Sequence, residues 1–333
     1  MRKKQESGHR LQAARRKSPR DTRFRNSETC ARKPAGFLGE DANAQRKVQK
    51  AKRSPQKKSA KSDFIKIKKL QPLQPERETP VPIRNLDGDV LVGVLHEPAQ
   101  KTDTIVIALH GLMATKDQAL IRQTCTEIAR AGFAAYRVDF SGNGSSEGRF
   151  EDATPKKLLR DTVATVEKFR SYKRIILLGH SLGGLIALVS ASRVHVHGLI
   201  LIAAPTHPER YPELLSAQQN RELASVGFTI ITVKRSVGDV PYTITERFVE
   251  EMADLHPLDA ARDVHCPVLL IRGSGDDIWP PTGKPIPTDD DSALLNALFS
   301  REMFLVGGAN HNFTTPEHLD ILIAKVISWL RNH

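Results

Sequence analysis

Residues 174–184 read Arg-Ile-Ile-Leu-Leu-Gly-His-Ser-Leu-Gly-Gly, an apolar run followed by the pattern Gly-x-Ser-x-Gly. The run is typical of a buried strand, and the segment after it has the character of a helix. Small residues at Gly179 and Gly183 let the strand and the helix approach around a sharp turn, which presents the Ser181 hydroxyl clear of the sheet. A serine hydroxyl is a weak nucleophile that needs a base and an orienting acid. The motif therefore predicts two partner residues elsewhere in the chain.

Two later strand-like segments lead into side chains of the required types. Residues 268–273 precede Asp276 and Asp277, and a strand-like segment nearer the C-terminus precedes His311. This chain order of serine, acid and histidine is the one expected when the serine follows a strand in this way. We expect His311 to take the proton of Ser181 and an aspartate to orient the imidazole. Residue type alone leaves Asp276 and Asp277 equal for that role.

A third segment supplies a turn suited to an oxyanion hole. The strand-like run 104–109 ends in His110 and Gly111, and the glycine permits a tight backbone there. An oxyanion hole needs two backbone N–H groups directed at the developing negative charge. We expect one N–H group from Leu182, the residue after the serine, and the other from Leu112 in this turn.

Strand-like and helix-like segments alternate from about residue 78 to the C-terminus. Such alternation predicts an α/β domain whose mostly parallel sheet has right-handed crossovers and helices on both faces. The continuous apolar strands agree, because a parallel sheet is buried on both sides. The expected strands are 81–84, 90–96, 104–109, 134–140, 174–178, 196–204, 267–272 and 303–306, and the expected helices are 119–131, 158–169, 182–192 and one that begins near Thr315 and Pro316.

Residues 206–262 interrupt the alternation with a charged stretch that contains a second hairpin-like element. Insertions at the carboxyl edge of such sheets build lids and substrate pockets. We therefore predict a lid, with a plain surface excursion as the alternative. Phe228, Tyr242 and Trp279 are candidate pocket residues, and ordinary packing of these aromatic rings is the competing interpretation.

The basic charge of the chain is concentrated in residues 1–69. This segment has 23 Lys and Arg against 6 Asp and Glu, whereas residues 70–333 have 27 against 32, and the whole chain has a net charge of +12. Few large apolar residues occur in it, so burial cannot offset its ordering entropy, and we predict a disordered extension before a single domain over 70–333. An incidental solvated tail is the first interpretation. Weak non-specific contact with nucleic acid or an anionic membrane and an organelle transit peptide are the alternatives.

Several classes of protein and site are disfavoured by the sequence. No run of 18 apolar residues occurs, so no transmembrane helix is expected. Three scattered cysteines fit a reducing cytosol rather than a disulfide framework, and a cytoplasmic location is predicted. The chain has no phosphate-binding loop of the Gly-x-x-x-x-Gly-Lys-Ser/Thr type, and no cofactor is expected. Residues Asp289–Asp291 are interpreted as a solvated loop; no metal is predicted there because the other ligand spacing of a cation site is lacking.

These motifs together resemble those of the α/β-hydrolase superfamily over about residues 78–333. The resemblance is to the feruloyl and cinnamoyl esterase and serine aminopeptidase-like group. It implies an eight-stranded α/β-hydrolase fold with a short hairpin-bearing lid, carboxylic-ester hydrolysis, and Asp276 rather than Asp277 as the acid. Trp279 and the long loop 282–292 depart from the pattern of the group. These departures affect the expected shape of the pocket rim and not the three catalytic candidates. The motifs that carry the resemblance are Leu109–Leu112, Asp139–Gly148, Gly179–Gly184, Gly273–Asp276 and Gly308–Phe313.

The main hypothesis is a cytosolic serine hydrolase that cleaves small carboxylic esters through an acyl-enzyme, with a small-molecule ester as its partner. A thioesterase, a monoacylglycerol lipase or a serine aminopeptidase-like enzyme would use the same three residues, because the acyl pocket decides between such substrates. The hypothesis from another class is a non-catalytic binding module whose basic tail docks on nucleic acid or a membrane.

Overall fold

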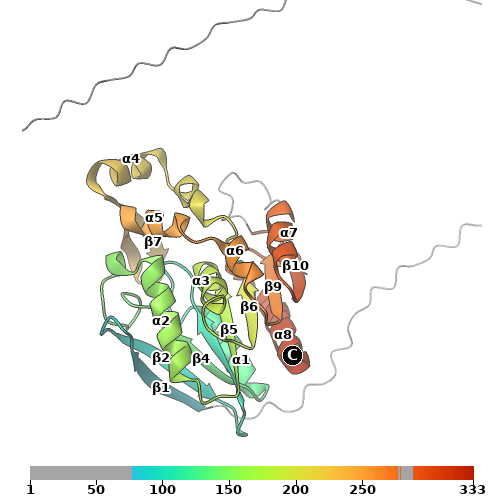
Figure 1. The fold of residues 1–333 in the computed structure, drawn as a ribbon. Helices are drawn as coiled ribbons and strands as arrows, with labels where there is room; N and C mark the ends of the chain where they lie inside the picture. Colours follow the sequence, from blue (N-terminus) through green and yellow to red (C-terminus); the bar gives the residue numbers. More distant parts are fainter. Residues whose placement is uncertain (1–76, 277, 279–287) are drawn as a thin grey trace, which may run out of the picture. The chain divides into compact units, whose positions relative to one another are not determined.

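The computed structural model describes residues 77–276, 278 and 288–333 (Figure 1). Eight strands form one sheet in the order β1-β2-β4-β3-β5-β6-β9-β10. All neighbours from β4 to β10 are parallel, whereas β2 is antiparallel to both β1 and β4. The mostly parallel eight-stranded sheet predicted from the sequence is thereby confirmed. The strands are β1 Arg77–Arg84, β2 Val90–Glu97, β3 Thr104–Leu109, β4 Ala134–Val138, β5 Arg174–His180, β6 Gly198–Ile202, β9 Val268–Gly273 and β10 Arg301–Val306.

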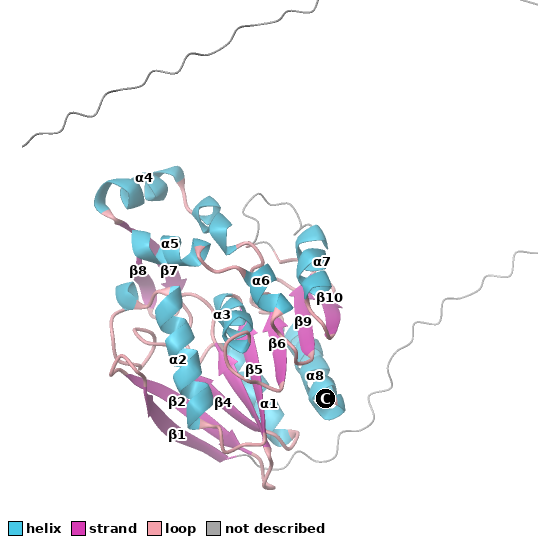
Figure 2. Ribbon diagram, viewed as in Figure 1, coloured by secondary structure: helices cyan, strands magenta, loops and turns pink. Residues whose placement is uncertain are grey.

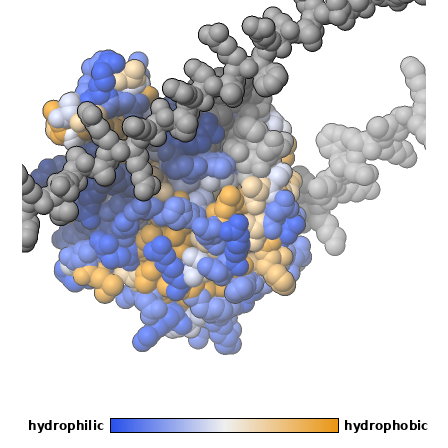
Figure 3. Space-filling model, turned by 45° about the horizontal axis from the view of Figure 1, so that its top comes forward, coloured by the Kyte–Doolittle hydropathy of each residue, from blue (hydrophilic) through white to orange (hydrophobic). Residues whose placement is uncertain are grey.

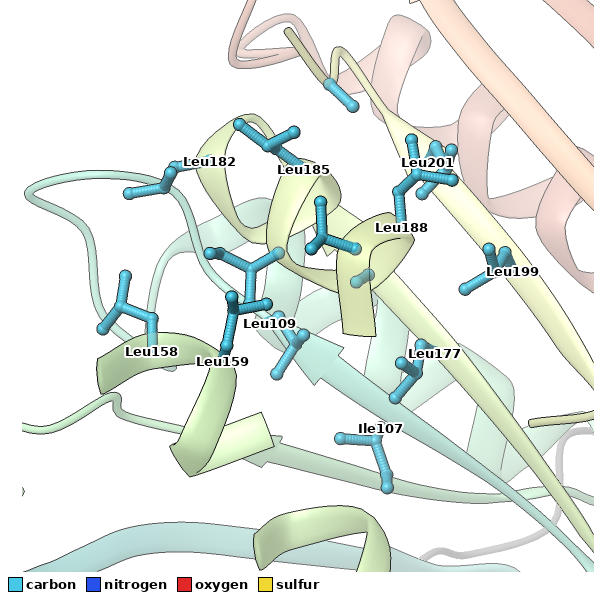
Figure 4. Close-up of a cluster of buried hydrophobic side chains, with 14 of the residues drawn as sticks. Ile107, Leu109, Leu158, Leu159, Leu177, Leu182, Leu185, Leu188, Leu199 and Leu201 are labelled. Atoms are coloured by element: carbon cyan, nitrogen blue, oxygen red, sulfur yellow. The ribbon is translucent and has the colours of Figure 1, made fainter. Parts of the chain in front are cut away.

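Helices cover both faces of this sheet (Figure 2). Helices α2 (Pro155–Lys168) and α3 (Leu182–Ala191) pack on one face, and α1 (Ala119–Arg130) and α8 (Pro316–Asn332) pack on the other. The alternation along β3 explains both layers. Ile107 and Leu109 point into the layer of α2 and α3, where Figure 4 shows them among leucines of both helices. Val106 and Ala108 point into the layer of α1 and α8. Both faces of the central strands are therefore core.

The stretch 206–262 forms a separate group of elements between β6 and β9. Most of them lie beyond the carboxyl ends of the strands, at the top of Figure 1, whereas the last helix, α6 (Pro257–Arg262), lies beside α3 and leads into β9. The second hairpin expected there is present, and its strands pair antiparallel from Phe228 with Thr245 to Arg235 with Gly238. The elements are the 3-10 helix η2 (Pro208–Leu214), α4 (Ala217–Val226), β7 (Phe228–Arg235), β8 (Gly238–Thr245), α5 (Glu246–Ala253) and α6 (Pro257–Arg262).

The structure corrects the prediction that Asp289–Asp291 lies in a solvated loop. These residues belong to helix α7 (Thr288–Ala297), and Asp291 is only 4% exposed. Its carboxylate accepts hydrogen bonds from Nε of Arg272 on β9 at 3.0 Å and from Nη2 at 2.8 Å. A buried carboxylate is tolerated when a guanidinium pairs with it. Asp291 therefore attaches α7 to the sheet.

Exposed apolar side chains occur in several separate places on the surface. On the face that Figure 3 shows, hydrophobic patches alternate with hydrophilic residues. Some of the exposed apolar side chains lie on the hairpin of the insertion and others near the edge strand β10. They include Phe228, Ile230, Val237, Phe299, Met303 and Leu305.

Candidate active site

Ser181 stands at a strained turn between β5 and α3. Its φ is +52° and its ψ is −122°, a conformation that L-residues avoid. The surroundings enforce this geometry, because the Ser181 N–H donates to the carbonyl of Ile202 at 2.8 Å. The Ser181 carbonyl in turn accepts the N–H of Leu185 at 3.1 Å, which begins α3. The sharp strand-to-helix turn that the Gly-x-Ser-x-Gly pattern predicts is thus present.

The two outer glycines of the motif are required by close backbone contacts. A Cβ atom at Gly179 would lie 2.2 Å from the carbonyl oxygen of Gly183. A Cβ atom at Gly183 would lie 2.4 Å from the carbonyl oxygen of Leu109 at the end of β3. Both distances are far below a van der Waals contact, so β3, β5 and α3 can approach each other only when these positions lack side chains.

Asp276 and His311 are brought together from the loops after β9 and β10. The Nδ1 atom of His311 lies 2.9 Å from Oδ2 and 3.0 Å from Oδ1 of Asp276, and both side chains are buried. The Asp276 carboxylate also accepts the backbone N–H of Ile278 at 3.3 Å. Since a carboxylate accepts, Nδ1 carries the proton and Nε2 is left free to act as a base. The alternative acid, Asp277, lies outside the described residues.

Backbone hydrogen bonds hold these two loops against each other. The N–H of Gly275 donates to the carbonyl of Ala309 at 2.9 Å, and the N–H of Gly308 donates to Oγ of Ser274 at 2.7 Å. A Cβ atom at Gly273 would lie 2.1 Å from the Ala309 carbonyl oxygen. The aspartate and the histidine therefore meet because β9 and β10 are parallel neighbours whose loops interlock.

Ser181 and His311 open into the same cavity of about 590 Å³. In the described part of the chain no hydrogen bond joins the serine hydroxyl to the imidazole, and such contacts commonly tighten only when substrate is bound. Most of the lining is apolar and comes from the strand-end turns and the insertion. It comprises Gly111, Leu112, Met113, Ala114, Gln118, His180, Ser181, Leu182, Ala203, Pro205, Tyr211, Leu214, Leu215, Ile231, Met252, Ile278, His311 and Asn312.

Leu112 and Leu182, the expected oxyanion-hole residues, both border the cavity. Leu182 is the first residue of α3, and the N–H groups of a first helical turn have no acceptor within the helix. The turn that contains Leu112 is closed by a hydrogen bond from Ala114 N–H to the Gly111 carbonyl at 3.2 Å, and Met113 has a φ of +55°. The two turns that the sequence analysis singled out thus face one space.

A buried ion pair supports the turn after β3. Nζ of Lys116 lies 2.8 Å from Asp139, whose carboxylate also accepts the backbone N–H of Lys116 at 2.7 Å and of Ser145 at 2.9 Å. Burial opposes the charged form of Lys116, yet the carboxylate of Asp139 keeps the pKa of the amine above its usual value. The loop after β4 is therefore fastened to the turn after β3.

Two buried histidines next to the site are neutral. His110 lies between the Gly111 carbonyl, 2.8 Å from Nδ1, and the backbone N–H of Phe140, which donates to Nε2 at 3.2 Å. Burial lowers the pKa of His110 below 6.5. Burial also lowers the pKa of His180 to about 3, and the neighbouring His311 adds to that effect. Neither imidazole carries charge near neutral pH.

Two of the candidate pocket aromatics, Phe228 and Tyr242, are absent from the lining of the cavity. Phe228 is 44% exposed at the start of β7 and does not line the cavity. Tyr242 does not line it either; its ring packs edge-on against Phe150, with centroids 4.8 Å apart. Both differ from the expectation. Phe228 lies on the opposite face of β7 from Ile231, the hairpin residue that borders the cavity. Tyr242 pairs with Ile231 across the hairpin and shares its face, but its ring packs against Phe150. Trp279 lies outside the described residues.

Arg235 links the hairpin of the insertion to the turn after β3. Its guanidinium donates to the backbone carbonyl of Met113 and lies 3.3 Å from the hydroxyl of Tyr242. Several cavity residues that the sequence analysis missed also come from the insertion, namely Tyr211, Leu214, Leu215 and Met252. They lie on short elements whose apolar spacing does not distinguish cavity lining from core.

The described residues contain neither a metal-binding cluster nor a membrane-spanning helix. Among residues 77–276, 278 and 288–333, no three His, Cys, Asp or Glu side chains gather in a way that would hold a metal ion. None of the described helices combines the length and the hydrophobicity that a membrane span needs.

Comparisons with known proteins agree with this architecture. Residues 100–237 match the protein family described as "Serine aminopeptidase, S33". A putative hydrolase from Agrobacterium vitis S4 superposes with a TM-score of 0.62 at 23% identity, covering 77% of this chain and 99% of that chain. Est1E from Butyrivibrio proteoclasticus with bound ferulic acid gives a TM-score of 0.62 at 22% identity, covering 75% and 98%.

The chain has the α/β-hydrolase fold. The similarity in sequence is narrower. The human palmitoyl-protein thioesterase ABHD10, mitochondrial, is 31% identical over 153 residues, which cover 45% of this chain and 49% of that protein. The match thus spans about half the length of the relative. In this fold the serine turn of the chain follows β5 and its aspartate and histidine loops follow β9 and β10, and the resemblance to feruloyl esterases stated above holds at the level of the fold.

Proposed function

We propose that this α/β-hydrolase cleaves carboxylic esters through an acyl-enzyme on Ser181. The observation that carries the proposal is the hydrogen bond between His311 Nδ1 and Asp276, which leaves Nε2 as a base facing the cavity that contains the serine. In this mechanism His311 accepts the proton as the serine oxygen attacks the acyl carbon. The imidazolium then gives the proton to the leaving oxygen as the C–O bond breaks, and water repeats the two steps to release the acid.

Other groups at the site have supporting roles in the proposed mechanism. Asp276 holds the useful tautomer of His311 and stabilises the imidazolium. The backbone N–H groups of Leu112 and Leu182 stabilise the negative charge on the acyl oxygen. The apolar lining contributed by the insertion, such as Leu215 and Met252, binds the acyl chain. In this proposal residues 206–262 act as the lid over the acyl pocket.

The assignment of the nucleophile is tested with p-nitrophenyl butanoate. Replacing Ser181 by alanine is expected to lower kcat more than about 10³-fold, because the nucleophile and its base act as a unit. Ser192→Ala, at the other end of α3, is the control and is expected to retain the wild-type rate. Equal turnover by wild type and Ser181→Ala would sink the proposal. Labelling with a fluorophosphonate, located by mass spectrometry, identifies the reacting serine independently.

Thioester hydrolysis is a second candidate on the same residues. The human relative is named as a palmitoyl-protein thioesterase, and the cavity here is lined mostly by apolar side chains. Matched oxygen and sulfur esters of butanoic, octanoic and hexadecanoic acids separate the two functions. A higher kcat/KM for the thioester at equal acyl chain favours the thioesterase, and the opposite order favours the esterase. Location in the cytosol stays a prediction, as does any contact of residues 1–69, which lie outside the described residues.

A further inference from the structure

His180, the residue directly before Ser181, joins the serine turn to the loop that contains the base. Its Nε2 lies 2.9 Å from the backbone oxygen of His311, and the centroids of the two rings are 5.1 Å apart. Because a carbonyl oxygen only accepts, Nε2 carries the proton and donates it. The His180 ring is 2% exposed, so water does not compete for this hydrogen bond.

The hydrogen bond from His180 restrains a different part of His311 from the one held by Asp276. The carboxylate holds the imidazole ring through Nδ1, whereas His180 holds the main chain through the carbonyl. The remaining contacts of the histidine loop run elsewhere: the Ala309 carbonyl bonds to the loop after β9, and Asn312 bonds to Gln118 at 3.2 Å. Within the described part of the chain, the His180 bond is the one that ties this loop to the serine turn.

The His180 ring is also enclosed by the turn after β3. A Cβ atom at Gly111 would lie 3.2 Å from Nδ1 of His180, and Nδ1 is buried without a hydrogen-bond partner among the described residues. A buried polar atom without a partner carries a free-energy cost. The ring that carries this cost links two loops, because its other nitrogen, Nε2, donates to the His311 carbonyl. Burial keeps the pKa of His180 near 3, so this donor stays neutral while His311 becomes positively charged.

We propose that His180 is a positioning residue that sets the distance and direction of the His311 base relative to Ser181. The inference rests on the ester hydrolysis proposed above. In that reaction His311 must reach the serine proton first and the leaving oxygen afterwards. A displaced imidazole harms the second transfer most when the leaving oxygen needs the proton. An ethoxide leaving group needs it, whereas p-nitrophenolate leaves readily as an anion.

The test is therefore a ratio of kcat/KM for the ethyl ester to kcat/KM for the p-nitrophenyl ester of one acid. Inactive or misfolded enzyme cancels in this ratio, so a purely structural loss does not change it. His180→Leu is expected to lower the ratio about tenfold or more, within the range that general acid–base catalysis contributes. His180→Gln, whose amide N–H reaches the same carbonyl, is expected to recover most of it.

Two further variants keep the test decisive. His180→Asn has the same amide on a side chain shorter by one methylene, so it is expected to give the low ratio if reach matters. This variant stands in for His180→Leu if the leucine protein does not fold. His197→Leu removes another histidine contact, the hydrogen bond from Ile175 N–H to Nδ1 at 3.2 Å beside the start of β6, and is expected to leave the ratio unchanged.

The outcomes separate the inference from the function it rests on. A wild-type ratio in both His180→Leu and His180→Asn, with Ser181→Ala inactive, overturns the positioning role and leaves the esterase standing. Equal ratios in His180→Gln and His180→Asn also overturn it, because the hydrogen bond is then irrelevant. Full activity in Ser181→Ala removes the proposed function, and the positioning role falls with it.

Discussion

Strained backbone in the described residues is concentrated around the site. Four residues other than glycine have a positive φ there: Met113, Ser181, Ala203 and Phe313. The first three line the cavity, and the fourth lies two residues after His311. Such conformations persist only where the surrounding structure enforces them. At Ser181 the strain is the consequence of presenting a hydroxyl at a turn between a strand and a helix.

This strain predicts an unusual order of stabilities at Ser181. Ser181→Gly is expected to be more stable than Ser181→Ala by about 1 kcal/mol, because glycine tolerates a φ of +52° and both variants lack the hydroxyl. Free energies of unfolding in urea measure the difference. Ser192, whose φ is −74°, is the matched control, and there alanine is expected to be the more stable replacement. The same order at both positions would contradict the interpretation.

At the scale of the elements, α7 is held to the sheet by charge as well as by apolar packing. Asp291 pairs with Arg272, and the guanidinium also donates to the carbonyl of Ala204, two residues after the end of β6. The pair thus connects α7, β9 and the segment that leads into the insertion. Both side chains are buried, so neither charge is well solvated without the other.

Removing one partner of this pair is expected to be costly. Asp291→Ala leaves the Arg272 guanidinium buried without its carboxylate, and a loss of about 3–5 kcal/mol in the free energy of unfolding is expected. The double variant Arg272→Met, Asp291→Leu is expected to lose less than Asp291→Ala alone, because no unpaired charge remains. Urea unfolding of wild type, Asp291→Ala and the double variant measures the two losses. A loss in the double variant as large as that in Asp291→Ala, or larger, would show that the unpaired charge is not the cause.

At the scale of the whole molecule, buried neutral histidines connect stability to pH. His110 and His180 have pKa values lowered by burial, whereas an unfolded histidine titrates near 6.5. Below that pH the unfolded chain binds protons that the folded chain does not. Their contribution to stability is therefore complete above about pH 6.5 and is lost as the pH falls toward the folded value, which is about 3 for His180.

The prediction concerns the difference between wild type and His180→Gln. Between about pH 7 and about pH 5 the wild type is expected to lose about 2 kcal/mol more of its free energy of unfolding, since glutamine does not titrate. Urea unfolding at the two pH values gives both losses, and contributions shared by the two proteins cancel. Losses of equal size would indicate that folding does not lower the pKa of His180.

Much of the fold follows from local patterns in the chain. The hydrophobic periodicity predicted all eight strands of the main sheet and the helices on both of its faces, with differences at the ends. The strand expected to run to residue 204 ends at Ile202, because Ala203 has a positive φ while its N–H still bonds to the Ile271 carbonyl. The helix expected from residue 158 begins at Pro155, where proline suits the first helical position.

Other features depended on contacts that no local pattern contains. A run of three aspartates is indistinguishable from a solvated loop until the Arg272 guanidinium is seen beside Asp291. Phe228 and Tyr242 are aromatic residues in the right segment, yet Ile231 is the hairpin residue that borders the cavity. Phe228 is on the opposite face of β7, and the Tyr242 ring packs against Phe150. The bond from His180 to the His311 carbonyl joins residues 131 positions apart.

The amino-acid sequence by itself determined the order of the elements and the chemical types at three strand ends, because hydrophobic period and glycine positions act over a few residues. It thereby identified Ser181, His311 and one of Asp276 and Asp277 as candidates, and the family resemblance favoured Asp276. The tertiary structure alone decided which side chains line the cavity and which buried charges find a partner. Those outcomes depend on side chains from distant segments that meet only when the sheet is assembled, so their free energies are properties of the folded molecule.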